Sequence, residues 1–98
     1  MATCYIKYRE KLDANEIYNL YKDYYKDEPF VKVLDKDRLP ELKDVVHTNF
    51  CHIGIKVVED KGLVVAVGVI DNLLKGASGQ AVQNMNIMCG FNEKEGLI

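Results

Sequence analysis

The sequence has little cysteine and proline and no tryptophan. Its three cysteines, Cys4, Cys51 and Cys89, cannot all pair within one chain, and none lies in a CxxC spacing. A disulfide framework of the kind found in small secreted domains is therefore not expected. Reduced thiols in a cytoplasmic protein are the simpler interpretation.

An excess of one charge and a long hydrophobic run are also missing. The formal net charge is −2, and no stretch concentrates lysine and arginine, so nucleic acid is not an expected partner. The longest apolar run, at residues 62–70, is well short of the roughly 20 residues that cross a bilayer. Neither a membrane span nor a signal peptide is expected, which again favours the cytoplasm.

What is present fits one compact domain. The chain has 98 residues, of which 48% are hydrophobic and 29% are charged, as in ordinary soluble domains. A chain of this length can build one core, but a complete dinucleotide-dependent enzyme would not fit. Because an alternating strand pattern begins almost at Met1, we expect the sequence to be a piece of a longer protein.

Hydrophobic periodicity predicts the secondary structure. Alternation of apolar and polar residues, together with short apolar runs, predicts strands at residues 3–9, 30–34, 52–58 and 63–70. The last two strands form a hairpin whose turn places Gly62 at positive φ. Asp13 and Glu16 supply the capping signal of a helix over residues 14–25.

A second amphipathic helix is expected at about residues 75–89, ending at a left-handed Gly90. Its predicted apolar face consists of Leu74, Ala77, Ala81, Val82, Met85 and Met88. Its predicted polar side consists of Gln80, Gln83 and either Asn84 or Asn86. The order of elements predicts an α+β fold, with helices on one face of a largely antiparallel sheet. The last helix can dock on the sheet, swing free or pair with a second copy.

Two histidines and a cysteine are the first candidates for chemistry. His47 and His52 would lie on opposite faces of an extended segment, and Cys51 does not complete a tetrahedral ligand set. A Cys–His nucleophile pair would need an orienting group and an oxyanion hole, which the sequence does not indicate. We therefore assign no metal site and no catalytic residue, and we expect these side chains to be packed in strands.

Tyrosines gather on the first predicted helix, at positions 18, 21, 24 and 25. A stacking surface for bases or rings is one interpretation. Packing of the rings against a sheet, with the hydroxyl groups at the edge, is the preferred one.

Residues 71–80 follow a strand and open a helix, with glycines at positions 76 and 79. Free N–H groups at a helix start favour anions, and glycine lets the backbone approach a ligand. The spacing is neither a Walker loop nor a GxGxxG fingerprint. Close packing of the helix on the sheet, through Gly76, Ala77, Gly79 and Ala81, is the alternative explanation.

The residues themselves resemble a known family. Residues 69–88 read VIDNLLKGASGQAVQNMNIM and closely resemble the C-terminal signature of N-acetyl-gamma-glutamyl-phosphate reductases, in the semialdehyde dehydrogenase superfamily. Residues 21–34, 49–54 and 95–97 are also similar to that family. One departure is that Val46-His47-Thr48-Asn49 stands where members often carry Gly-Ser before the asparagine.

The resemblance implies a domain assignment. Residues 1–98 would be the C-terminal portion of the catalytic and dimerisation domain, including the final cofactor-side helix at about 75–89. The dinucleotide-binding domain would be absent from this chain and would be its partner, and a homo-oligomer is expected. The alternative is a stand-alone α+β binding or dimerisation module that is related to the enzyme.

The resemblance also implies a function and a site. The parent enzyme would use NADPH to reduce N-acetyl-glutamyl 5-phosphate to the semialdehyde in arginine biosynthesis, and the chain alone would be inactive. The nucleophilic cysteine and basic histidine of the family lie upstream, so no catalytic residue is carried over. Asn72 and Gly76 are carried over by position as cofactor-binding residues, because in related dehydrogenases this amide contacts the nicotinamide carboxamide and Gly76 lies where the helix backbone nears the cofactor. An amide suits that role since it both donates and accepts.

Overall fold

A computed structural model describes residues 1–9, 13–36 and 38–97. Its centre is a four-stranded sheet in the order β1-β4-β3-β2. The strands are β1 (Ala2–Lys7), β2 (Val31–Val33), β3 (Cys51–Val58) and β4 (Leu63–Val69). β4 pairs antiparallel with β1 and β3, and only the short β2 runs parallel to its neighbour β3. The predicted α+β fold with a largely antiparallel sheet is confirmed.

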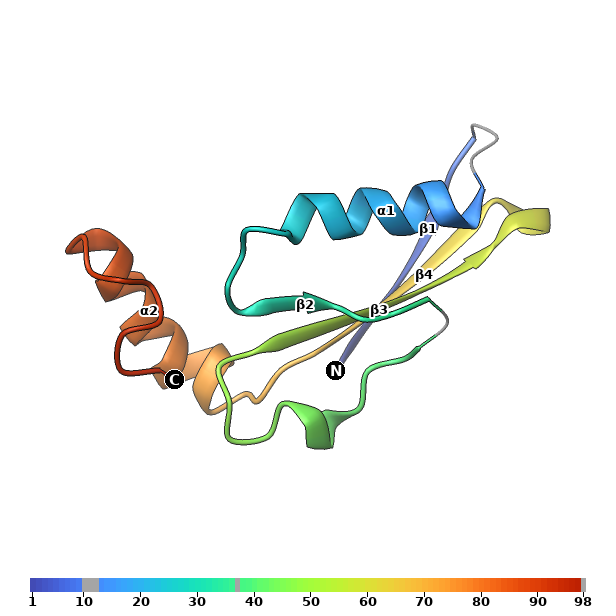
Figure 1. Ribbon diagram of the computed structural model, residues 1–98. Helices are drawn as coiled ribbons and strands as arrows, with labels where there is room; N and C mark the ends of the chain where they lie inside the picture. Colours follow the sequence, from blue (N-terminus) through green and yellow to red (C-terminus); the bar gives the residue numbers. More distant parts are fainter. Residues whose placement is uncertain (10–12, 37, 98) are drawn as a thin grey trace.

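Helix α1 (Ala14–Tyr25) lies along one face of the sheet (Figure 1), with the bounds predicted from the sequence. The Asp13 carboxylate caps it by accepting a hydrogen bond from the Glu16 N–H at 2.7 Å. Ile17 is buried against Val33, Ile55 and Val64, and burial of such a side chain stabilises a fold by about 1.5–3 kcal/mol. The cap and this buried contact explain why the helix forms here.

The tyrosines of α1 pack as the preferred interpretation expected. Tyr18, Tyr21 and Tyr25 are partly buried against the core, and the Tyr18 hydroxyl donates to the Leu34 carbonyl at 2.6 Å. Tyr24 is the exception, because this residue is 77% exposed.

The β3–β4 hairpin also follows its prediction. A short turn, η2 (Glu59–Lys61), connects the strands, and Gly62 has a φ of 58°. The register pairs Val58 with Leu63 and His52 with Val69. This register places Ile53, Ile55 and Val57 on the side that faces α1.

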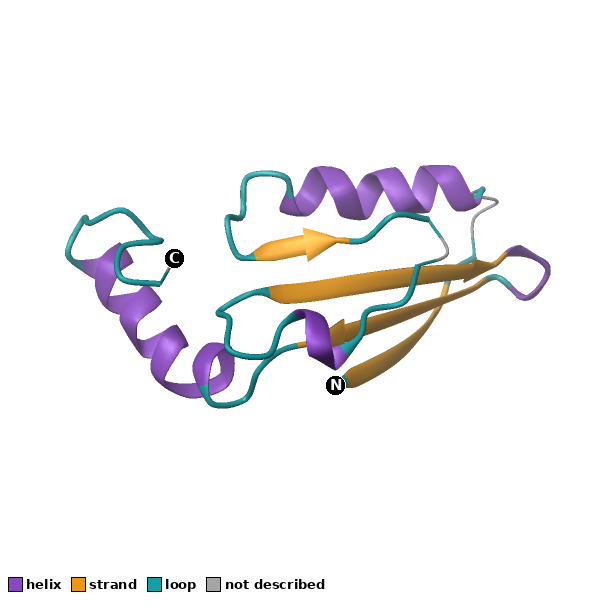
Figure 2. Cartoon of the chain, turned by 60° about the horizontal axis from the view of Figure 1, so that its bottom comes forward, coloured by secondary structure: helices purple, strands orange, loops and turns teal. Residues whose placement is uncertain are grey.

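The face opposite α1 is only partly covered. The segment that carries η1 (Leu42–Asp44) crosses it, as Figure 2 shows in front of the strands. This segment lies so close to β3 that a Cβ atom on Gly54 would be 2.5 Å from Pro40 Cδ. At the β1 edge of the sheet this cover is missing. All six β1 residues are exposed, and Tyr5 is 72% exposed.

The last helix differs from its prediction in its first turn and in its position relative to the sheet. It begins with a π-helical turn, η3 (Leu74–Ser78), and continues as α2 (Gly79–Met88). α2 lies beyond the ends of the strands rather than over the sheet (Figures 1 and 2), so of the two α-helices in the described part of the chain only α1 lies along a face. Gly90, with a φ of 74°, ends it as predicted, and the Phe91 N–H donates to the Asn86 carbonyl at 2.8 Å.

The expected polarity of this helix was wrong. Gln83, which was placed on the polar side, and Asn86, which was one of two residues allowed there, are 7% and 1% exposed, whereas Met85 and Met88 are 49% and 85% exposed. The amides can be buried because each has hydrogen-bond partners outside the helix. No helix in the described part of the chain is long and apolar enough to span a membrane.

Candidate functional site

The candidate site starts two residues after the end of β4, at Asp71. Its carboxylate accepts hydrogen bonds from the backbone N–H of His47 and of Leu73, both at 2.8 Å. These bonds, with the His47 bond first, lower the pKa of Asp71 below its ordinary value, because they favour the charged form. The carboxylate therefore ties the loop before β3 to the turn that carries Asn72.

The turn after Asp71 is π-helical. The N–H of Gly76 donates to the Asp71 carbonyl at 3.2 Å, and the N–H of Ser78 donates to the Leu73 carbonyl at 3.1 Å. Both bonds connect residues five apart. Such turns are rare and are often found at functional sites.

This turn brings the two predicted cofactor residues together. Both Asn72 and Gly76 are exposed, and a Cβ atom on Gly76 would be 3.8 Å from Asn72 Oδ1. The Asn72 amide therefore lies beside an exposed stretch of backbone. Such an amide can donate one hydrogen bond and accept another from a ligand.

The two glycines of the segment differ in their surroundings. A Cβ atom on Gly79 would overlap Asn49 Oδ1 and would lie 2.7 Å from the Leu74 carbonyl oxygen. Around Gly76 the nearest atom, Ile70 Cδ1, would be 3.5 Å away. Close packing therefore accounts for Gly79, whereas Gly76 is not required by packing.

A buried polar network supports the turn from the inside, and the sequence did not reveal it. Gln83 Oε1 accepts from Asn49 Nδ2 at 3.0 Å and from Lys75 Nζ at 2.6 Å. Gln83 Nε2 donates to a carboxylate oxygen of Glu93 at 2.6 Å. The Lys75 ammonium also lies 5.5 Å from the centre of the Phe30 ring, and burial lowers the pKa of Lys75.

The histidines and Cys51 do not form a second site. Burial raises the pKa of the Cys51 thiol, which is the opposite of what an activated nucleophile needs. Burial lowers the pKa of His52, which lies next to Phe50 at 6.5 Å between ring centres. Within residues 1–9, 13–36 and 38–97, no three His, Cys, Asp or Glu side chains lie together as a metal site would require.

Known proteins match this chain over nearly its whole length. It is 50% identical to the N-acetyl-gamma-glutamyl-phosphate reductase of Thermoanaerobacter pseudethanolicus over 99% of the chain. It is 53% identical to the reductase of the same name from Methanosphaera stadtmanae over 91% of the chain. A third reductase of that name, from Staphylococcus saprophyticus, is 46% identical over 100% of the chain.

The match covers a small part of each relative. The chain spans 28% of the Thermoanaerobacter protein, 26% of the Methanosphaera protein and 29% of the Staphylococcus protein. The family model described as semialdehyde dehydrogenase, dimerisation domain, matches residues 1–72, which include α1 and all four strands. The chain therefore belongs to the semialdehyde dehydrogenase dimerisation-domain family.

Proposed function

We propose that this chain works as the C-terminal part of an NADP-dependent N-acetyl-gamma-glutamyl-phosphate reductase. The enzyme would reduce N-acetyl-glutamyl 5-phosphate to the semialdehyde in arginine biosynthesis, in the cytoplasm. The observation that carries the proposal is the near-complete match of the chain to reductases that are more than three times longer. The nucleophile, the base and the dinucleotide-binding domain would come from the upstream part.

In that enzyme, Asn72 and Gly76 would face the nicotinamide end of the cofactor. Bound NADPH supplies the hydride. The Asn72 amide would bind and orient the carboxamide through one donor and one acceptor, and the small Gly76 would let the helix backbone come close. Asp71 would hold this turn in place through its bonds to His47 and Leu73.

The exposed side of α2 supports a partner domain. Met85 and Met88 are 49% and 85% exposed, and their spacing of three residues puts them on the same side of the helix. Neighbouring exposed apolar residues can mark an interaction surface. We assign this surface to the N-terminal dinucleotide-binding domain of the same protein.

The open part of the sheet supports self-association. Tyr5 and Val65 are direct neighbours across β1 and β4, on the face opposite α1, and Val67 follows on the same face. We propose that two copies cover this face in a homo-oligomer. The same observation favours the second candidate function, a stand-alone dimerisation module that shares its origin with the enzyme.

A chimaera tests the enzyme proposal. The chain would replace the corresponding 28% of the Thermoanaerobacter reductase, and NADPH oxidation with the acyl phosphate would be measured. We expect an active chimaera in which Asn72→Ala raises the KM for NADPH about tenfold, as loss of a well-placed hydrogen bond does. Asn19→Ala, the same change at an exposed position of α1, is the matched control.

The two candidate functions predict different results for the chimaera. A folded, dimeric chimaera without activity would favour the stand-alone module. An active chimaera in which Asn72→Ala and Asn19→Ala bind NADPH equally well would remove Asn72 from the site while leaving the enzyme proposal in place.

A further inference from the structure

The amide of Gln83 connects two charged side chains, one from the turn before α2 and one from the residues after it. Its oxygen accepts from the Lys75 ammonium and its nitrogen donates to the Glu93 carboxylate, each at 2.6 Å. An ammonium can only donate and a carboxylate can only accept, so these partners fix which end of the amide faces each of them. Gln83, which is 7% exposed, is therefore held in one orientation.

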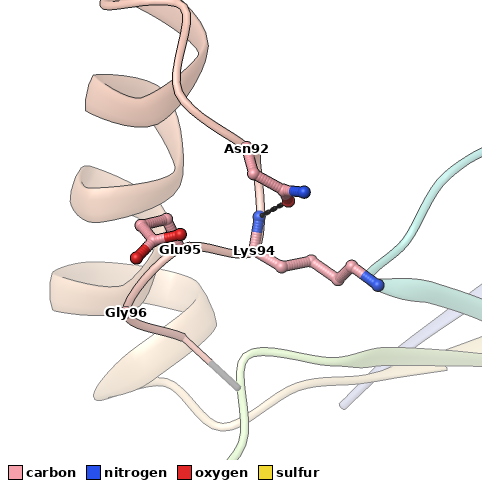
Figure 3. Close-up of a pocket in the computed structure, with 4 residues that line it drawn as sticks. All are labelled: Asn92, Lys94, Glu95 and Gly96. Carbon is pink, nitrogen blue, oxygen red and sulfur yellow. Dashed lines mark hydrogen bonds between the residues drawn. The ribbon is translucent and has the colours of Figure 1, made fainter.

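The tail after α2, residues 92–97, holds Glu93 in place. The Asn92 side-chain oxygen accepts from the Lys94 N–H at 3.0 Å, which closes a turn around Glu93 (Figure 3). Asn86 Nδ2 of α2 donates to the Glu93 carbonyl oxygen at 3.1 Å. Both the backbone and the side chain of Glu93 are therefore bonded to α2.

The π-helical turn brings Lys75 and Gln83 to the same side of the helix. The two residues are eight apart. In a regular α-helix, with 3.6 residues per turn, residues eight apart point about 80° away from each other around the axis. A π-helical turn contains one extra residue, which reduces this angle to about 20°. The bond between Lys75 and Gln83 therefore favours the π-helical form of the turn over a regular α-helical one.

Lys75 depends on this bond because its ammonium is partly buried. Burial lowers the pKa of Lys75, since removal from water disfavours the charged form. The Gln83 oxygen and the Phe30 ring, whose centre lies 5.5 Å away, offset that cost. Without the Gln83 oxygen the ammonium would move toward water, as lysine side chains do at surfaces. The turn would then lose the bond that ties it to α2.

We propose that Gln83, Lys75 and Glu93 are positioning residues for the cofactor site, so that the tail controls the affinity for NADPH. They hold the turn in the form that places Asn72 beside Gly76, and Lys75 lies between these two residues in the sequence. The identity of the ligand rests on the proposed function. If the turn is correctly formed in only one molecule in five, the apparent affinity falls about fivefold.

Gln83→Glu is the central variant. Its carboxylate still accepts from Lys75, but it cannot donate and it faces the Glu93 carboxylate instead. In the chimaera with the Thermoanaerobacter reductase we expect the KM for NADPH to rise about fivefold. The kcat should stay within about twofold of the native value, because bound NADPH keeps the turn formed.

A second substitution should restore the affinity. Adding Glu93→Gln to Gln83→Glu exchanges the donor and the acceptor, so the new carboxylate accepts from Lys75 and from the amide at position 93. We expect the KM of this double variant to return close to the native value. Asn84→Asp is the matched control, because it adds the same charge on the exposed side of α2, where the side-chain oxygen accepts from Gln80. Its KM should equal the native one.

Hydrogen exchange, followed by mass spectrometry, tests the turn without any ligand. The N–H groups of Gly76 and Ser78 donate to carbonyl oxygens five residues earlier. Peptides that span residues 73–79 should therefore exchange several-fold faster in Gln83→Glu and as slowly as the native protein in the double variant. Glu93→Ala removes the acceptor without changing α2 and should accelerate exchange in the same direction, which keeps the test available if Gln83→Glu does not fold.

Two results in an active chimaera would overturn the proposal. One is an unchanged KM for NADPH in Gln83→Glu, and the other is a raised KM that Glu93→Gln does not restore. An inactive native chimaera would count against the proposed function instead. Hydrogen exchange still decides in that case, because equal exchange of residues 73–79 in the native protein, Gln83→Glu and Glu93→Ala would show that the tail does not position the turn.

Discussion

His47 is a histidine in a backbone conformation that favours glycine. Its φ is 63°, and its N–H is held by the Asp71 carboxylate. The resembled family often carries Gly-Ser before the asparagine, which would put a glycine at position 47. The positive φ gives the physical reason, because a Cβ atom makes the left-handed region unfavourable.

We therefore expect His47→Gly to stabilise the chain. Removing the Cβ atom from a residue in the left-handed region should raise the free energy of unfolding by about 1–2 kcal/mol. Glycine is also more flexible in the unfolded chain, and this lowers the gain by roughly half. Urea unfolding should show a gain of up to about 1 kcal/mol. Thr48→Gly is the neighbouring control and should lose stability, because Thr48 Oγ1 donates to the Val45 carbonyl at 2.6 Å. If both His47→Gly and Thr48→Gly lose stability, the backbone of His47 is not strained in the way proposed.

Asp71 makes stability depend on acid pH. Its folded-state pKa lies below the ordinary value of 3.8 because backbone N–H groups stabilise the charged form. The stabilisation is therefore complete above the unfolded-state pKa and is lost as the pH falls through the folded-state pKa. Asp71→Asn should be less stable than the native chain at pH 7, with a difference that shrinks below about pH 4.

Urea unfolding from pH 7 to pH 3 would measure this difference. The control is Glu41→Gln, which removes an exposed ion pair with Lys43 at 3.0 Å, since such pairs contribute little. If the difference in unfolding free energy between Asp71→Asn and the native chain stays constant in acid, the charge of Asp71 does not contribute to stability.

At the scale of elements, local signals predicted α1 and the β3–β4 hairpin. The Asp13 cap and the apolar stripe through Ile17 need only nearby residues, and so does the turn at Gly62. The π-helical turn and the orientation of α2 could not be predicted in this way. Asn49 and Gln83 are 34 residues apart, and no periodicity within the helix reveals such a partner.

Gly79 and Gly68 should respond differently to the same substitution. A Cβ atom on Gly79 would meet Asn49 and the Leu74 backbone, whereas a Cβ atom on Gly68 would have no atom within 4 Å. Gly79→Ala should therefore lose about 1–3 kcal/mol of unfolding free energy, and Gly68→Ala should stay within about 0.5 kcal/mol of the native chain. Thermal or urea unfolding measures both, and equal losses would show that α2 is not packed this closely.

At the scale of the whole molecule, the uncovered face of the sheet should control self-association. Val65→Lys places a charge beside Tyr5, which is 72% exposed on that face, and burying an unpaired charge in an interface is costly. We expect it to shift the chain from dimer to monomer in sedimentation velocity experiments. Leu20→Lys adds the same charge on the outer side of α1, where Leu20 is 64% exposed, and should leave the dimer intact. The reverse result would move the interface to α1 and its tyrosines.

The α+β class, the bounds of α1, the hairpin and the position of Asn72 and Gly76 after β4 could all be predicted from the sequence. These features depend on capping, periodicity and turn residues that act over a few positions. Only the tertiary structure decided that Asn72 lies beside Gly76 on a π-helical turn and that α2 turns its amides inward. The physical reason is that a buried amide is stable only with its partners, and those of Gln83 and Asn86 come from the loop before β3, from Lys75 and from the tail.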